Sequence, residues 1–204
     1  MLEPWRIFNE IIRGPWNTSG LDVQWKALLV DGTPYLAFQA SASKMDWLNN
    51  FWAFVEPYKR QERKLLVHAG FARAWKSCND EVVGNFAALC EISNQRPVIV
   101  GHSFGGAMSV LAAEDFNYRT KLRPMVVTFG APKVLWGESS AEAVRLCADF
   151  TMYSQRNDPV PLCPPLPGYK HPSQIKIGDK FCFFKLFNPN KYHQLYGSFE
   201  EYLK

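Results

Sequence analysis

The pentapeptide Gly101-His102-Ser103-Phe104-Gly105 constrains the fold of this chain more than any other sequence feature. It directly follows the apolar run of residues 97–100 and leads into a helical pattern over residues 104–115. A Gly-x-Ser-x-Gly sequence between a buried strand and a helix is typical of a nucleophile elbow, in which the glycines leave room for a strained turn and an exposed serine hydroxyl. The sequence therefore predicts that Ser103 is a nucleophile and that the amide of Phe104, at the start of the helix, faces a developing oxyanion.

Apolar runs and helical patterns alternate around this pentapeptide. Runs typical of buried strands occur at residues 97–100, 124–129 and 150–154, and helical patterns at residues 104–115 and 139–148 separate them. This alternation predicts an α/β fold with a mostly parallel central sheet and helices on both faces. No linker is long or polar enough to divide the chain, so we expect a single domain over residues 1–204.

Shorter elements are expected on either side of this core. The turn-rich tetrad Asp31-Gly32-Thr33-Pro34 predicts a hairpin between the β-type runs of residues 23–30 and 35–40. The other expected elements are an amphipathic helix over residues 3–13, a helix over residues 43–54, a strand at residues 65–68, a helical region over residues 70–94 interrupted near Asn79, a terminal hairpin over residues 175–186 and a last helix over residues 194–203.

The composition bears on the partners of the chain. Its formal net charge is only +4, and the densest basic patch, at residues 59–64, contains a glutamate. This patch is interpreted as a solvated face, with a weak attraction to anionic membrane surfaces as the second interpretation. Basic residues are not paired with stacking aromatic residues, so no nucleic-acid partner is expected. No stretch of about 20 apolar residues occurs, so no transmembrane segment is expected.

The N-terminal residues and the cysteines bear on the compartment. The first residues lack a basic region followed by an apolar one, so they do not predict a signal peptide. The five cysteines are scattered without Cys-x-x-Cys spacing, which favours free thiols over a disulfide framework or a zinc site. A cytoplasmic location is therefore expected, although secretion of a processed form would also fit.

An activated serine needs a base within hydrogen-bond reach and a carboxylate that orients this base. Hydrolases with this elbow carry the acid and then the histidine after the serine, and only His171 and His193 follow Ser103. His193, where a loop enters the last helix, is the preferred base, and His171 in a proline-rich loop is the alternative. The candidate acids are Asp115, Asp149, Asp158 and Asp179.

Asp158 is the preferred acid, because it follows the run of residues 150–154 and catalytic loops lie beyond the carboxyl ends of parallel strands. Asp149 precedes the same run and is expected at the opposite edge. The alternative interpretation is that Asp158 has no catalytic role and only begins a turn before Pro159.

These motifs together resemble the class 3 (fungal-type) lipases, which have the α/β-hydrolase fold. The resemblance covers most of the chain, from about residue 35 to residue 197. It implies that His193 is the catalytic histidine and that His68, His102 and His171 are not catalytic. The segments that carry it are Gly101–Ala107, Val127–Val134, Arg156–Pro161 with Pro164-Pro165, Gly168–Pro172, His193-x-x-Tyr196 and His68–Phe71.

The resemblance also assigns a second oxyanion contact. The family carries Phe-Arg-Gly-Ser/Thr where this chain has Phe38-Gln39-Ala40-Ser41, so Ser41 inherits the role of the hydroxyl residue. Gln39 and Ala40 depart from the usual Arg-Gly. The alternative interpretation is that Ser41 is a polar residue at the end of a strand.

The helix that begins near Ser43 occupies the position of the family's lid. Trp47, Phe51 and Trp52 lie on one face of this predicted helix, and they are candidates for an apolar cover that opens at a lipid surface. The alternative is a fixed helix packed on the core.

The chain is therefore expected to be a serine esterase or lipase that hydrolyses acylglycerols or similar lipid esters through an acyl-enzyme, without a metal or an organic cofactor. Its expected partners are the ester substrate and, peripherally, a lipid surface. Hydrolysis of phospholipid sn-1 esters or feruloyl esters is the alternative, and a lipase-like binding protein without turnover is a further one.

Overall fold

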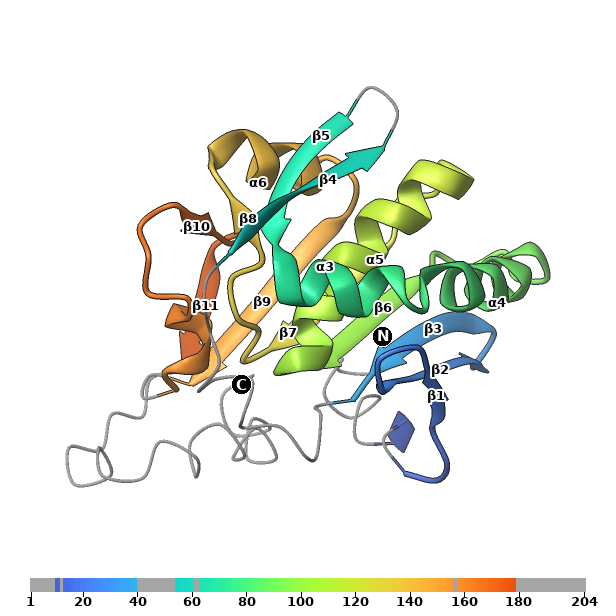
Figure 1. The fold of residues 1–204 in the computed structure, drawn as a ribbon. Helices are drawn as coiled ribbons and strands as arrows, with labels where there is room; N and C mark the ends of the chain where they lie inside the picture. The colour runs from blue at the N-terminus through green and yellow to red at the C-terminus, as the bar shows by residue number, and fades with distance from the viewer. Residues whose placement is uncertain (1–9, 12, 40–53, 61–62, 156–157, 179–204) are drawn as a thin grey trace.

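A seven-stranded sheet runs through the described part of the chain, which comprises residues 10–11, 13–39, 54–60, 63–155 and 158–178 of a computed structural model (Figure 1). Its strands, in spatial order, are β1 (Asn17–Ser19), β2 (Val23–Val30), β3 (Thr33–Phe38), β6 (Val98–His102), β7 (Met125–Phe129), β9 (Asp149–Gln155) and β11 (Ile175–Gly178). β1, β2 and β3 pair antiparallel, whereas β3, β6, β7, β9 and β11 pair in parallel. The expected mostly parallel sheet is therefore present.

The apolar runs of β6 and β7 are continuous because both faces of the sheet are buried. Ile99 and Val126 belong to the larger of two hydrophobic clusters, whereas their neighbours Val100 and Val127 belong to the smaller one. Successive side chains of a strand point to opposite faces, so the two clusters lie on the two faces of the sheet. Ile11 from the N-terminal region packs in the smaller cluster.

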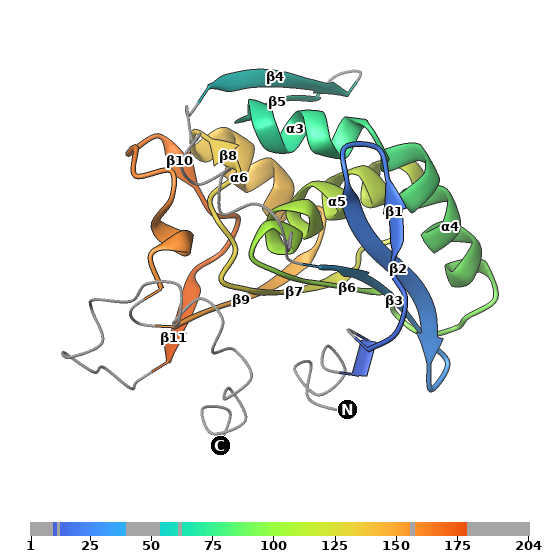
Figure 2. The same cartoon turned by 60° about the horizontal axis from the view of Figure 1, so that its bottom comes forward.

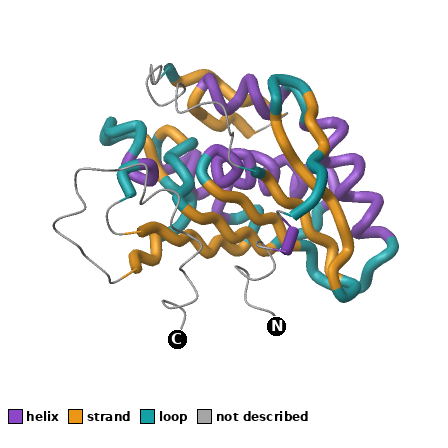
Figure 3. Tube along the Cα trace, turned by 90° about the horizontal axis from the view of Figure 1, so that it is seen from below, coloured by secondary structure: helices purple, strands orange, loops and turns teal. Residues whose placement is uncertain are grey.

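On the face opposite the helical residues Glu10 and Ile11, four helices cover the sheet (Figures 2 and 3). They are α3 (Ala69–Lys76), α4 (Asn79–Glu91), α5 (Phe104–Thr120) and α6 (Glu138–Arg145). α5 lies centrally and is buried from Gly105 to Phe116. The expected helix over residues 194–203, and most of the one over residues 3–13, lie outside the described residues. No helix of the described residues is long and apolar enough to cross a membrane.

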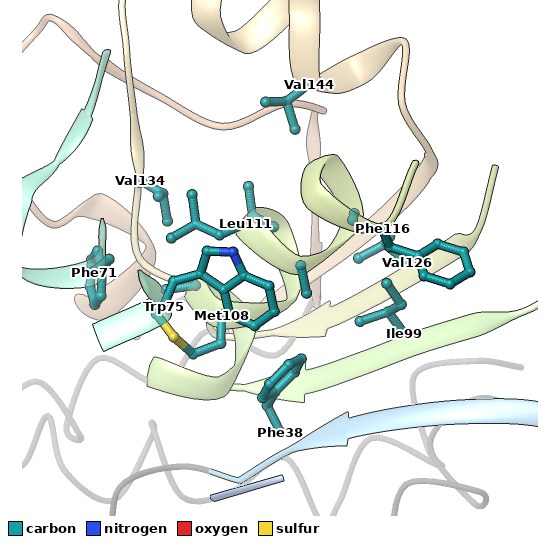
Figure 4. Close-up of a cluster of buried hydrophobic side chains, with 14 of the residues drawn as sticks. Phe38, Phe71, Trp75, Ile99, Met108, Leu111, Phe116, Val126, Val134 and Val144 are labelled. Atoms are coloured by element: carbon teal, nitrogen blue, oxygen red, sulfur yellow. The ribbon is translucent and has the colours of Figure 1, made fainter. Parts of the chain in front are cut away.

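The larger cluster joins these helices to the strands. Its side chains come from α3, α4, α5, α6 and several strands, and Figure 4 shows part of them. Trp75 of α3 packs edge-on against Phe38 of β3, with 6.0 Å between the ring centroids. Burial of such large side chains contributes about 1.5–3 kcal/mol each, so this cluster is what holds α3 and α5 on the sheet.

A second, antiparallel sheet in the order β10-β8-β5-β4 lies beside α3 and α6 (Figures 1 and 2). It consists of β4 (Val55–Arg60), β5 (Arg63–His68), β8 (Leu135–Trp136) and β10 (Tyr169–Lys170). Sequence analysis predicted only part of β5. The paired residues Tyr58 and Leu65 are both buried, whereas the basic residues of the expected solvated patch occupy the turn end of the β4–β5 hairpin.

Three other expectations can be compared with the structure. The hairpin of β2 and β3 is confirmed, and Asp31 and Gly32 have φ of 49° and 77° in its turn. The helical region of residues 70–94 divides at Ser77 and Cys78, between α3 and α4. The first arm of the expected terminal hairpin is β11, which instead pairs in parallel with β9, and residues 179–186 lie outside the described residues.

Candidate active site

The turn between β6 and α5 has the strained geometry of a nucleophile elbow. Ser103 occupies this turn with φ of 58° and ψ of −124°. A residue other than glycine at positive φ costs on the order of 1–3 kcal/mol, so the surrounding structure must hold it in place. The amide of Ser103 donates to the Phe129 carbonyl at 2.9 Å, and its own carbonyl accepts from the Gly106 amide at 2.9 Å. The serine is thereby fixed to β7 on one side and to α5 on the other.

The glycines of the pentapeptide are required by close backbone contacts. A Cβ on Gly101 would lie 2.2 Å from the Gly105 carbonyl oxygen, and one on Gly105 would lie 2.3 Å from that of Phe38. A Cβ on Gly106 would lie 2.6 Å from the Cβ of Ala131, just beyond β7. The three glycines therefore let the elbow, the end of β3 and the segment after β7 approach one another closely.

The start of α5 supplies an electropositive environment next to Ser103. Phe104 is the first residue of this helix, and amides at a helix N-terminus carry a partial positive charge. The Phe104 ring packs near that of Phe71 of α3, with 5.9 Å between centroids. The geometry is compatible with the expected oxyanion contact through the Phe104 amide, which stays a prediction.

Asp158 follows β9 on the same sheet edge as Ser103, which follows β6. Because β6, β7 and β9 are parallel, their carboxyl ends meet at this edge. Asp158 is buried, with 4% of its surface exposed, and its Oδ1 accepts from the Val160 amide at 2.9 Å. Its own amide donates to Gln155, the last residue of β9, at 3.0 Å. The carboxylate is therefore oriented by the 3₁₀ turn Val160–Leu162 that follows it.

The other described acid candidates have different roles in the structure. Asp149 pairs with Met125 at the opposite edge of the sheet, where Arg96 and Arg123 bind it. Asp115 is fully buried and accepts from Trp75 Nε1 at 3.1 Å, from Asn79 Nδ2 at 3.0 Å and from Arg119 Nε at 2.6 Å. It thus joins α3, α4 and α5. Asp179 lies outside the described residues.

Two described histidines are held in structural positions. His68 precedes α3 as its N-cap, and its Nδ1 accepts from the Gly70 amide at 3.2 Å. His171 lies 2.8 Å from the Pro161 carbonyl through its Nε2. Burial lowers the pKa of each ring to about 4, so both rings are neutral near pH 7.

The remaining site predictions fall outside the described residues. These are the base His193, the oxyanion residue Ser41 and the candidate lid residues Trp47, Phe51 and Trp52. The described chain does lead toward Ser41, because Gln39 bonds to Gln24 of β2 and its carbonyl oxygen would lie 2.9 Å from a Cβ on Gly105. Gln39, the last described residue before Ser41, thus lies beside the elbow.

Sequence reasoning missed the contact of His171 with Pro161, because no local pattern signals a bond across ten residues. It also missed the packing of Gly106 on Ala131. Within the described residues, no group of three His, Cys, Asp or Glu side chains could hold a metal ion. No disulfide joins Cys78, Cys90, Cys147 and Cys163, the four cysteines of the described ranges.

Comparison with known proteins identifies relatives of this chain. A family model described as Lipase (class 3) matches residues 35–167. Secreted mono- and diacylglycerol lipase A of Penicillium cyclopium is 30% identical over 143 residues, which cover 68% of this chain and 45% of that protein. Secreted mono- and diacylglycerol lipase 1 of Fusarium solani is 33% identical over 146 residues, which cover 68% of this chain and 41% of that protein. The chain spans less than half the length of these relatives.

Solved structures show the same fold. Lipase II from Rhizopus niveus superposes with a TM-score of 0.72 at 26% identity, covering 80% of this chain and 64% of that structure. A triacylglycerol lipase whose catalytic centre is described as a serine protease triad superposes with a TM-score of 0.72 at 22% identity, covering 81% of this chain and 66% of that structure. The architecture is that of the α/β-hydrolase fold, as the sequence predicted.

Proposed function

We propose that this chain, which belongs to the class 3 lipase family, is a serine esterase that hydrolyses acylglycerols or similar lipid esters through Ser103, Asp158 and His193. The observation that carries the proposal is the strained backbone of Ser103 between β6 and α5. A positive φ at a serine is costly, and such strain clusters at functional sites; in a nucleophile elbow it holds the serine hydroxyl at the tip of a sharp strand-to-helix turn.

The proposed reaction proceeds through an acyl-enzyme. Ser103 Oγ attacks the ester carbonyl while His193 takes its proton, and Asp158 orients the imidazole and stabilises its cation. The amides of Phe104 and Ser41 receive the oxyanion of the tetrahedral intermediate. His193 then protonates the leaving alcohol. Water next attacks the acyl-enzyme while His193 takes its proton, and His193 returns this proton to Ser103 Oγ as the carboxylic acid leaves.

The surroundings of His171 favour His193 as the base. The Nε2 of His171 is bonded to a backbone carbonyl, and its Nδ1 is buried without a hydrogen-bond partner among the described residues. A general base is most effective when its pKa lies near the working pH, whereas burial lowers the pKa of His171 to about 4. His193 is the other histidine that follows Ser103.

Acylglycerols are the proposed substrates because relatives bear the names mono- and diacylglycerol lipase and triacylglycerol lipase. Contact with a lipid surface through Trp47, Phe51 and Trp52 is part of the proposal. Among the described residues, Phe54 supports this contact, because it follows Trp52 closely in the sequence and its side chain is 67% exposed. The location of the full protein is a separate question: several relatives are named as secreted, whereas the cysteine pattern predicts the cytoplasm, and fractionation of the source cells decides between them.

A fluorophosphonate probe tests the nucleophile, because only a serine activated in an oxyanion hole reacts rapidly with it. We expect labelling of the wild type at Ser103, loss of labelling in Ser103→Ala and strong loss in His193→Ala. Ser139→Ala, which changes an exposed serine of α6, is the control and should label normally. Labelling that persists in Ser103→Ala would refute the assignment.

A panel of p-nitrophenyl, acylglycerol, phospholipid and feruloyl esters then tests the substrate class. Turnover of acylglycerols above the other natural esters supports the proposal. A preference for phospholipid sn-1 esters or feruloyl esters would show that these are the substrates instead. Labelling by the probe without turnover of any ester would support a binding protein.

A further inference from the structure

His171 connects the segment after β10 to the loop that carries Asp158. It directly follows β10, and its Nε2 lies 2.8 Å from the carbonyl oxygen of Pro161 in the 3₁₀ turn. A carbonyl only accepts hydrogen bonds, so Nε2 carries the proton and donates it. The neutral ring is therefore in the Nε2–H tautomer, with a bare Nδ1 that is buried without a hydrogen-bond partner among the described residues.

The orientation of Asp158 depends on the turn that His171 contacts. Asp158 Oδ1 accepts from the Val160 amide at 2.9 Å, and the Leu162 amide closes the turn on Pro159 at 3.0 Å. A displacement of Pro161 would therefore move the amide of Val160 and the carboxylate bonded to it. The turn is too short to hold its own position, because 3₁₀ segments have poor hydrogen-bond geometry.

Two contacts attach this turn to elements far from it in the sequence. The Lys133 amide donates to the Cys163 carbonyl at 2.8 Å, just after the turn, and His171 donates within the turn itself. The position of His171 is fixed in its own right, because Arg145 Nε of α6 donates to the carbonyl of Pro172, the next residue, at 2.7 Å. α6 thus supports the histidine that supports the acid loop.

We propose that His171 is a positioning residue for the catalytic acid: it holds the turn Val160–Leu162, and through it the Asp158 carboxylate, in the place from which Asp158 orients His193. The inference rests on the proposed function. His171 touches no reacting atom. The low pKa that burial gives its ring keeps it neutral near pH 7, so it fixes the turn without adding a positive charge to it.

Two substitutions of His171 test this role: one keeps a hydrogen-bond donor at the position of Nε2, and the other moves the donor away from it. The side-chain amide nitrogen of glutamine can reach the place of Nε2, whereas that of asparagine reaches only the place of Nδ1. We expect His171→Asn to lower kcat about tenfold with KM nearly unchanged, because the acid acts in the transition state and not in substrate binding. His171→Gln should restore most of kcat.

The double variant Asp158→Asn/His171→Asn separates positioning from general loosening. If His171 acts only through Asp158, its removal should have no further effect on kcat once the acid is gone. Arg96→Met, at the opposite edge of the sheet, is the control for loss of stability alone. It should lower the melting temperature and leave kcat unchanged.

The outcomes distinguish the two proposals. If Asp158→Asn keeps full activity, the assignment of the acid fails, and the role of His171 fails with it. Three other outcomes would show that only the positioning role is wrong. In the first, Asp158→Asn loses activity and His171→Asn does not. In the others, the double variant loses the product of the two single-variant losses in kcat, or His171→Gln does not restore kcat. If His171→Asn does not fold, His171→Gln provides the test. A folded His171→Gln with a kcat as low as that of Asp158→Asn would likewise overturn the positioning role.

Discussion

The α-carbon of Gly105 lies against the carbonyl group of Phe38, so closely that a Cβ on the glycine would be 2.3 Å from the carbonyl oxygen. Phe38 ends β3, and Gly105 is the second residue of α5. This contact places the end of β3 directly beside the elbow of Ser103. It explains in physical terms why the last position of the pentapeptide has no side chain.

Gly105→Ala should therefore damage both stability and activity. Neither partner of the clash is a flexible side chain, so β3 and α5 must separate, at a cost of about 1–3 kcal/mol or more. Gly84→Ala is the matched control, because a Cβ there meets nothing within 4 Å in the middle of α4. It should stabilise the protein by about 0.5–1 kcal/mol. Urea unfolding and ester turnover of both variants check this, and a fully active Gly105→Ala would contradict it.

Asp115→Ala should destabilise the protein by about 3–5 kcal/mol, because it removes the buried carboxylate that accepts from Trp75, Asn79 and Arg119. Asp149→Ala removes an acid that is half exposed in its pairs with Arg96 and Arg123, and should cost at most about 1 kcal/mol. Thermal and urea unfolding measure the difference. Equal losses would show that burial does not decide the strength of these ion pairs.

The stability of the fold should decrease as the pH falls from about 6.5 to 4. Burial lowers the pKa of His68 and of His171 to about 4 in the folded chain, so below pH 6.5 the unfolded chain binds protons that the folded chain does not. Their contribution is fully present above pH 6.5 and is lost as the pH falls through 4. Each pKa unit corresponds to about 1.4 kcal/mol.

His68→Asn tests how much the His68 ring contributes to this pH dependence of stability. Asparagine can still cap α3 by accepting from the Gly70 amide but does not titrate, so the free energy of unfolding should depend less steeply on pH between 6.5 and 4. Loss of ring contacts with Phe71 and Tyr169 should lower the whole curve. An unchanged slope in urea titrations at several pH values would show that His68 does not contribute.

The lid hypothesis makes a prediction about substrate concentration. If Trp47, Phe51 and Trp52 form a mobile cover, the rate with short-chain esters should rise abruptly when droplets or micelles form, since the apolar face is then buried at the interface. Trp52→Ala should weaken this rise while the melting temperature stays nearly normal. A smooth rate curve together with a stability loss of about 3–5 kcal/mol would instead identify a fixed core helix.

Local sequence patterns were sufficient for the elements that bury continuous apolar runs. β6, β7 and β9 and the helices between them lie close to their predicted positions, because strands of a parallel sheet are apolar on both faces and need little tertiary information to be recognised. The elbow was predictable for a related reason: its glycines and its serine are adjacent in sequence, and the turn that requires them is local.

The second sheet and the support of the acid loop could not be predicted in this way. β4, β8 and β10 are short or charged, and each forms a strand through its partner: β4 and β8 pair with β5, and β10 pairs with β8. The bond from His171 to Pro161 likewise depends on how β10 lies beside the turn after Asp158. The sequence by itself determined the parallel sheet and the elbow pentapeptide, and it predicted the nucleophile and the order of the candidate catalytic residues, because these are properties of neighbouring residues. Only the tertiary structure showed that Asp115 joins three helices and that His171 bonds to Pro161, because both depend on contacts between segments that the chain brings together on folding.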